Sequence, residues 1–213
     1  ERAMALQRKY GEGRRILNTL QANGTLLTDD WCRFFRDHHF RIGLSIDGPE
    51  HLHNIYRKDA HGEGTFSRMM AGLELLQKHG VEFNTLTTVN AANADHAKEV
   101  YAFLREFSDF MQFLPVVESI PQAGGGNVAL PPGIYSKQPH RLAPFSVPAE
   151  AYGKFLCTIL DEWSCHKDIG HKFVQVFEAT LGNMTRRPAG LCVHEAVWGH
   201  CGGIEKNWER ECC

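Results

Sequence analysis

Strand-like and helix-like segments alternate along the first half of the chain, and this alternation restricts the fold more than any other sequence feature. Apolar residues recur at helical spacing in residues 29–39, 65–79 and 94–107. Short apolar or β-branched runs occupy residues 16–22, 41–47, 81–90 and 110–117. Such runs, bounded by turn residues, are typical of parallel strands that are buried on both faces. The pattern predicts an α/β fold of βαβ units, in either an open doubly wound sheet or a barrel.

The charge balance excludes several classes of partner. The 213 residues include 23 Lys and Arg against 25 Asp and Glu, so the formal net charge is −2. A chain so evenly charged lacks the basic surface that neutralises phosphates, and we expect no nucleic-acid partner. No run of 18 apolar residues occurs, and the first residues lack the apolar stretch of a secretory signal. We therefore expect no membrane partner and a cytoplasmic location.

The alternation stops after residue 120, which divides the chain into three predicted parts. Residues 1–147 contain the βαβ units and end in a long loop, residues 120–147, that is rich in Pro and Gly. Residues 148–190 begin with an amphipathic helix, since Pro148 suits a helix start and apolar residues follow at helical spacing. Residues 191–213 form a Cys-rich tail.

The first run of candidate site residues lies where the second predicted strand ends. Ser45 and Asp47 occupy this strand end, and ligands in parallel α/β folds bind outside the carboxyl ends of the strands. Asp47 could equally cap the turn at Gly48 and Pro49. Arg57 follows ten residues after Asp47. Its guanidinium could form two hydrogen bonds to a ligand carboxylate or to Asp47 itself, or be solvated.

The cysteines are a second candidate site. Four of the seven, Cys192, Cys201, Cys212 and Cys213, lie in the last 22 residues. In a reducing compartment such a cluster favours a metal or iron–sulfur centre over disulfides. No pair has the C-x-x-C spacing of a zinc finger, so an ordinary Cys-rich tail remains an alternative.

A succession of short motifs runs through the chain from the first helix to about Gly190. It includes LQANGTLL at 20–27, GLSIDGP at 43–49, HNIYR at 53–57, GVEFN at 80–84 and MQF at 111–113. This succession resembles the anaerobic sulfatase-maturating enzymes, which are radical S-adenosylmethionine enzymes with a SPASM-type auxiliary-cluster region. The resemblance implies a partial (β/α) barrel that binds a [4Fe–4S] cluster and S-adenosylmethionine.

The same resemblance implies a reaction and three contact residues. The family cleaves S-adenosylmethionine reductively, and the resulting radical abstracts hydrogen from a Cys or Ser of a sulfatase polypeptide to give Cα-formylglycine. Ser45 and Arg57 match the family's cofactor-binding serine and arginine. Val117 matches a residue that packs on the cofactor.

The chain also departs from the family at both ends. It has no C-x-x-x-C-x-x-C motif for the radical cluster, and no Gly-Gly-Glu-Pro loop. Cys192 and Cys213 fall on the first and third cysteines of the auxiliary region, whereas Trp198 replaces the second. The catalytic Asp that follows the third cysteine in the family is missing. We therefore expect a fragment of the barrel, truncated at both ends, which is inactive by itself in forming formylglycine.

Two other functions remain open at the level of the sequence. The chain could come from a different SPASM-type radical enzyme that modifies another peptide. It could also be a non-enzymatic module in which the Cys and His residues of the tail hold zinc.

Overall fold

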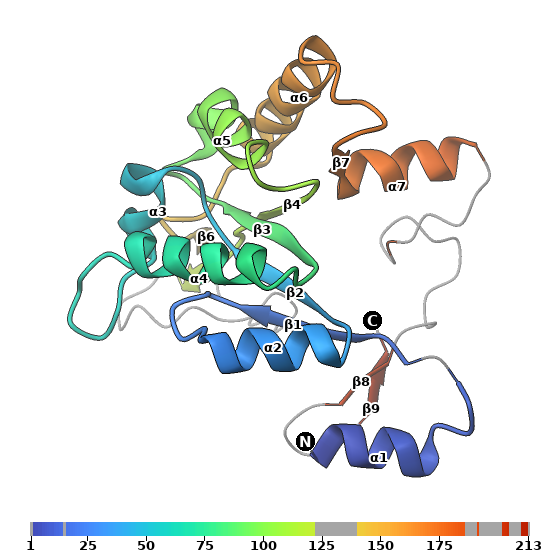
Figure 1. The fold of residues 1–213 in the computed structure, drawn as a ribbon. Coiled ribbons are helices and arrows are strands. Elements are labelled where there is room, and N and C mark those ends of the chain that lie inside the picture. Colours follow the sequence, from blue (N-terminus) through green and yellow to red (C-terminus); the bar gives the residue numbers. More distant parts are fainter. Residues whose placement is uncertain are drawn as a thin grey trace.

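A five-stranded parallel sheet organises the chain (Figure 1). The computed structural model describes residues 2–14, 16–121, 140–185, 191, 202–204 and 210–212. The sheet contains β1 (Asn18–Ala22), β2 (Phe40–Ser45), β3 (Phe83–Val89), β4 (Phe110–Pro115) and β7 (Phe173–Val174). Neighbouring strands follow the chain in the order β1-β2-β3-β4-β7, and all pairs are parallel.

This strand order settles the alternative that the sequence left open. A doubly wound sheet reverses its strand order at a switch point, and this sheet has no reversal. Right-handed crossovers between strands in sequential order place the connecting helices on one face of the sheet. The predicted partial (β/α) barrel is confirmed, and its sheet is open rather than closed.

The helices lie between the strands as the sequence predicts, with one addition. The chain starts with α1 (Arg2–Tyr10), and α2 (Asp29–Asp37) joins β1 to β2. Both α3 (Glu50–Tyr56) and α4 (Phe66–Lys78) join β2 to β3. Next come the 3-10 helix η1 (Ala94–His96) with α5 (Ala97–Leu104), then α6 (Ala149–Cys165) and α7 (Gln175–Met184). The sequence did not predict α3, which has seven residues and thus too few turns to show a helical period.

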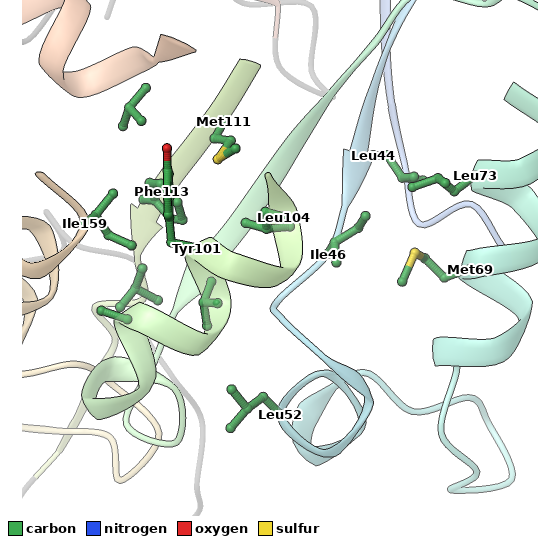
Figure 2. Close-up of a cluster of buried hydrophobic side chains, with 14 of the residues drawn as sticks. Leu44, Ile46, Leu52, Met69, Leu73, Tyr101, Leu104, Met111, Phe113 and Ile159 are labelled. Carbon is green, nitrogen blue, oxygen red and sulfur yellow. The ribbon is translucent and has the colours of Figure 1, made fainter. Parts of the chain in front are cut away.

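Alternating side chains of the strands fill the core between the sheet and the helices. Leu44 and Ile46 point toward Leu73 and Met69 of α4, as Figure 2 shows. Met111 and Phe113 of β4 do the same toward α5 and α6, where Tyr101 and Ile159 lie (Figure 2). Since successive strand residues point to opposite faces, Gly43 and Ser45 face away from the helices.

A glycine contact fixes how closely α4 approaches the sheet. Gly24 follows β1 with φ +78, a conformation that residues with a side chain rarely adopt. A Cβ at Gly72 of α4 would overlap the carbonyl oxygen of Gly24. The backbones of α4 and of the loop after β1 can therefore lie in direct contact only because Gly24 and Gly72 have no side chains.

The opposite face of the sheet is hollow and is lined by both polar and apolar side chains. A cavity of about 740 Å³ is lined there by side chains from four strands and their flanking segments. Gln21, Asn84 and Gln112 contribute amides from β1, β3 and β4, and Arg41 contributes a guanidinium from β2. This composition suits the interior of a partial barrel that receives a polar ligand.

The segments outside the sheet differ from the sequence prediction in two places. The expected loop at residues 120–147 is bounded by an antiparallel pair, β5 (Ser119–Pro121) with β6 (His140–Leu142). The tail, predicted only to be Cys-rich, contains a second antiparallel pair, β8 (Gly202–Ile204) with β9 (Arg210–Cys212). A three-residue strand is too short to show an alternating pattern, so neither hairpin leaves a signal in the sequence. In the described residues, no helix has both the length and the hydropathy that crossing a bilayer requires.

Candidate functional site

The predicted site residues meet at the carboxyl ends of the central strands. Ser45 is the last residue of β2 and pairs in register with Leu86 of β3. Arg57 directly follows α3, at the same end of the sheet. Val117 lies two residues beyond β4 and is 49% exposed. The structure thus brings all three to one edge, although no hydrogen bond joins Ser45 to Arg57 in the described part of the chain.

Ser45 contributes a buried hydroxyl to this edge. The residue is 4% exposed, and among the described residues its Oγ has no hydrogen-bond partner. Buried hydroxyl groups are nearly always hydrogen-bonded, so a hydroxyl without a partner in the protein suits a ligand contact. The cavity on this face lies toward the amino ends of the strands, since Arg41, Glu82 and Asp109 line it, and Ser45 is not part of its lining.

Arg57 binds Asp47, which is one of the partners that the sequence left open for its guanidinium. Its Nε donates to Asp47 Oδ2 at 2.6 Å, and its Nη2 donates to Asp47 Oδ1 at 2.9 Å. The Asp47 side chain is 3% exposed and that of Arg57 is 22% exposed. The guanidinium is therefore oriented by two parallel hydrogen bonds and its charge is balanced inside the protein. Nη1 makes no hydrogen bond to the described residues and is the donor that remains for a ligand.

Residues at the end of β3 and after it also bind Asp47. The backbone N–H and the hydroxyl of Thr88 both donate to Asp47 Oδ1, at 2.9 and 2.8 Å. Asn93 donates to the Asp47 carbonyl oxygen at 3.2 Å and to the Thr88 carbonyl oxygen at 2.9 Å. Asp47 thus links the carboxyl ends of β2 and β3.

His53 holds the same loop from within α3. The Asp47 N–H donates to His53 Nδ1 at 3.3 Å, so Nδ1 is an acceptor and the proton lies on Nε2. Nε2 lies 3.2 Å from Thr65 Oγ1, which in turn donates to the Arg57 carbonyl oxygen at 3.0 Å. Burial lowers the pKa of His53 to about 4, and the positive charge of Arg57 contributes while Asp47 opposes it. Neutral His53 therefore links the Asp47 loop, through Thr65, to the backbone of Arg57.

Sequence reasoning found Ser45, Asp47 and Arg57 but missed Thr88, Asn93 and His53. An N-x-x-N pattern at residues 90–93 was the available signal for Asn93, because Asn side chains often cap turns after strands. The backbone N–H groups of Asn90 and Asn93 do donate to each other's side-chain oxygens. His53 is buried and His51 is exposed, because residues two apart in a helix point to different faces.

The predicted metal ligands are not part of this edge. Cys192 and Cys213 lie outside the described residues, so their assignment as cluster ligands stays a prediction. Among the described residues, Cys32 lies on the buried side of α2, whereas Cys157 and Cys165 are exposed on α6. These three do not form a cluster-binding set.

Comparison with known proteins agrees with the open (β/α) architecture. The pattern of the radical SAM superfamily matches residues 1–104. A serine-type anaerobic sulfatase-maturating enzyme of Bacteroides thetaiotaomicron is 43% identical over 216 residues, which cover 100% of this chain and 51% of the relative. The chain belongs to the radical SAM superfamily.

Two further relatives support the same assignment. A cysteine-type anaerobic sulfatase-maturating enzyme of Clostridium perfringens is 39% identical over 140 residues, or 64% of this chain and 38% of the relative. The solved structure of native anSMEcpe with bound AdoMet matches with a TM-score of 0.74 and 32% identity, covering 89% of this chain and 48% of that one. This radical SAM chain thus spans about half the length of the curated relatives it matches.

Proposed function

We propose that the chain supplies part of the S-adenosylmethionine site of an enzyme that oxidises a Cys or Ser of a sulfatase to Cα-formylglycine. Relatives of both the serine type and the cysteine type support this function. A solved relative is described with bound AdoMet and a Cys peptide, which supports a peptide substrate. The substrate of the whole enzyme would then be a sulfatase polypeptide, and the reaction would take place in the cytoplasm.

The observation that carries the proposal is the Ser45 hydroxyl, which has no hydrogen-bond partner among the residues that the structure describes. It is buried at the carboxyl edge of β2, where parallel α/β folds bind ligands. A cofactor with polar groups would give this hydroxyl the partner that the described chain does not provide.

The other two residues fit the remaining chemistry of the cofactor. Arg57 is already neutralised by Asp47, so it acts as an oriented hydrogen-bond donor rather than as a free positive charge. Its Nη1 suits the carboxylate of an amino-acid ligand. Val117 offers exposed apolar surface against which an aromatic ring can pack. The network of Asp47, Thr88 and Asn93 acts by keeping this edge in place.

S-adenosylmethionine, when bound next to a reduced iron–sulfur cluster, supplies a radical that abstracts hydrogen. The described residues of this chain fit the S-adenosylmethionine but not the cluster, since none of the cysteines among them belongs to a group of metal-ligating side chains. We therefore assign binding and orientation of the cofactor to Ser45, Arg57 and Val117, and no cluster to this part of the chain. The auxiliary-cluster role of Cys192 and Cys213 and the division into residues 1–147, 148–190 and 191–213 belong to the same proposal.

Calorimetric titration of S-adenosylmethionine into the purified 213-residue chain tests this function. We expect binding by the wild type and a dissociation constant that is raised roughly fivefold in Ser45→Ala, since one neutral hydrogen bond contributes about 1 kcal/mol. Ser67→Ala removes an exposed hydroxyl from α4 and serves as the matched control with unchanged binding.

Either of two results would refute the assignment. One is the absence of binding to a chain that folds, with stoichiometric zinc in its place, as a non-enzymatic metal module would give. The other is equal affinity of Ser45→Ala and Ser67→Ala. We also expect no formylglycine from the chain alone, with sulfatase peptides of either the Cys or the Ser type.

A further inference from the structure

Three exposed side chains of types that can ligate a metal converge outside the Asp47 network described above. His51 projects from α3, His96 ends η1, and Glu99 lies in the first turn of α5. His51 Nε2 lies 3.4 Å from Glu99 Oε1, and His96 Nδ1 lies 3.3 Å from Glu99 Oε2. One ligand atom from each of the three residues lies within 4.8 Å of the other two.

The two histidine–carboxylate separations are close to the spacing of ligand atoms around a zinc ion. Zinc binds His nitrogen and carboxylate oxygen at about 2.0–2.1 Å in a tetrahedron, which puts ligand atoms about 3.4 Å apart. Two imidazoles and one carboxylate are also a ligand set that zinc uses with a fourth position open to water. We propose that His51, His96 and Glu99 bind a divalent transition metal of the zinc class, with solvent in the remaining coordination position.

The two histidines are held in place by the elements that carry them. His96 and Glu99 are three residues apart on consecutive helical turns and therefore share one face. The His96 N–H donates to the Asn93 carbonyl oxygen at 3.0 Å, which fixes the turn that presents its imidazole. The rings of His51 and His96 lie 6.3 Å apart and nearly perpendicular, at 78°. Metal binding thus requires small side-chain adjustments and no movement of the helices.

The ligands come from two crossovers that a metal would connect. The loop between β2 and α3 already packs on α5, because a Cβ at Gly48 would lie 3.1 Å from Val100. A metal that joins His51 to His96 and Glu99 would add a second link between α3 and η1–α5. Since Arg57 follows α3 and Asn93 precedes η1, the metal would stabilise both sides of the Asp47 network from outside.

The test must report on individual histidines, because thiolates are also zinc ligands and the chain has seven cysteines. We suggest diethyl pyrocarbonate modification of the metal-stripped 213-residue chain, with and without zinc chloride, and mass spectrometry of the modified peptides. We expect zinc to slow modification of His51 and His96 at least tenfold, and to leave exposed His171 unchanged.

Two carboxylate variants make the test specific. Glu99→Gln removes the anionic ligand and keeps the shape of the side chain, so the zinc concentration that protects both histidines should rise at least about tenfold. Glu74→Gln removes an exposed carboxylate on α4 and should behave as the wild type. Zinc that leaves His51 and His96 as reactive as His171, or protects them equally in Glu99→Gln and Glu74→Gln, would overturn the proposal.

Discussion

Replacing Asp47 by Ala should destabilise the protein strongly. The Asp47 carboxylate accepts four hydrogen bonds, two from Arg57 and two from Thr88. Its removal leaves the largely buried guanidinium of Arg57 without a counter-charge, which costs about 3–5 kcal/mol in buried pairs. Because Arg57 keeps some access to water, we expect the lower end of this range, about 3 kcal/mol.

The assay is the midpoint of thermal or urea unfolding, with a matched exposed pair as control. For a chain of this size, about 3 kcal/mol corresponds to a drop in melting temperature of roughly 6–12 °C. The control is Glu82→Ala, which removes the partner of Arg41 from a pair whose side chains are 61% and 73% exposed. Exposed pairs contribute at most about 1 kcal/mol, so this variant should stay close to the wild type.

The comparison can refute the reasoning directly. Equal losses of stability in Asp47→Ala and Glu82→Ala would mean that burial does not set the contribution of the Asp47 pair. The network around Arg57 would then not be what keeps this edge of the sheet in place.

Three further perturbations have expected outcomes that follow from the same structure. The free energy of unfolding should fall as the pH drops from about 6.5 to about 4, because His53 is protonated in the unfolded chain over this range but stays neutral in the folded protein. This difference contributes about 3 kcal/mol. In urea titrations, His53→Gln should show a shallower pH dependence of the free energy of unfolding. Gly72→Ala should lower the melting temperature in spite of its better helix propensity, whereas Gly153→Ala, in α6 with open space around it, should raise stability by up to about 1 kcal/mol; the same sign for both would contradict the close packing. Tyr101→Phe should cost about 1 kcal/mol in urea unfolding, because its hydroxyl donates to Asp168 at 2.7 Å in a buried site, and an unchanged midpoint would show that this bond is not stabilising.

The sequence predicted the architecture because its signals are periodic and long. The helices around residues 29–39 and 65–79 each have one apolar face. The strand at 41–47 ends in Ser45 and Asp47, which are polar residues suited to binding a ligand at the carboxyl edge of a sheet. The choice between a doubly wound sheet and a partial barrel could not be predicted, since strand order depends on tertiary pairing. The resemblance favoured the barrel, and the order β1-β2-β3-β4-β7 confirms it.

The site was predicted in part, for a physical reason that can be stated for each residue. Arg57 had three possible environments at a spacing of ten residues from Asp47, and only the turn made by α3 brings the two together. Thr88 is remote in sequence and reaches Asp47 through the register of β2 with β3. The role of His53 could not be predicted from the sequence, because it depends on burial, which lowers the pKa of the ring and keeps it neutral.

Backbone hydrogen exchange of the 213-residue chain, measured with and without S-adenosylmethionine, tests the central claim most directly. The proposed site predicts slower exchange on cofactor binding at the carboxyl edge of the sheet, in peptides that contain Ser45, Arg57, Thr88 and Val117. Peptides from the helix-covered face, such as α4, should exchange unchanged. Protection confined to other segments, or no protection at a saturating cofactor concentration, would contradict the assignment of this edge as the cofactor site.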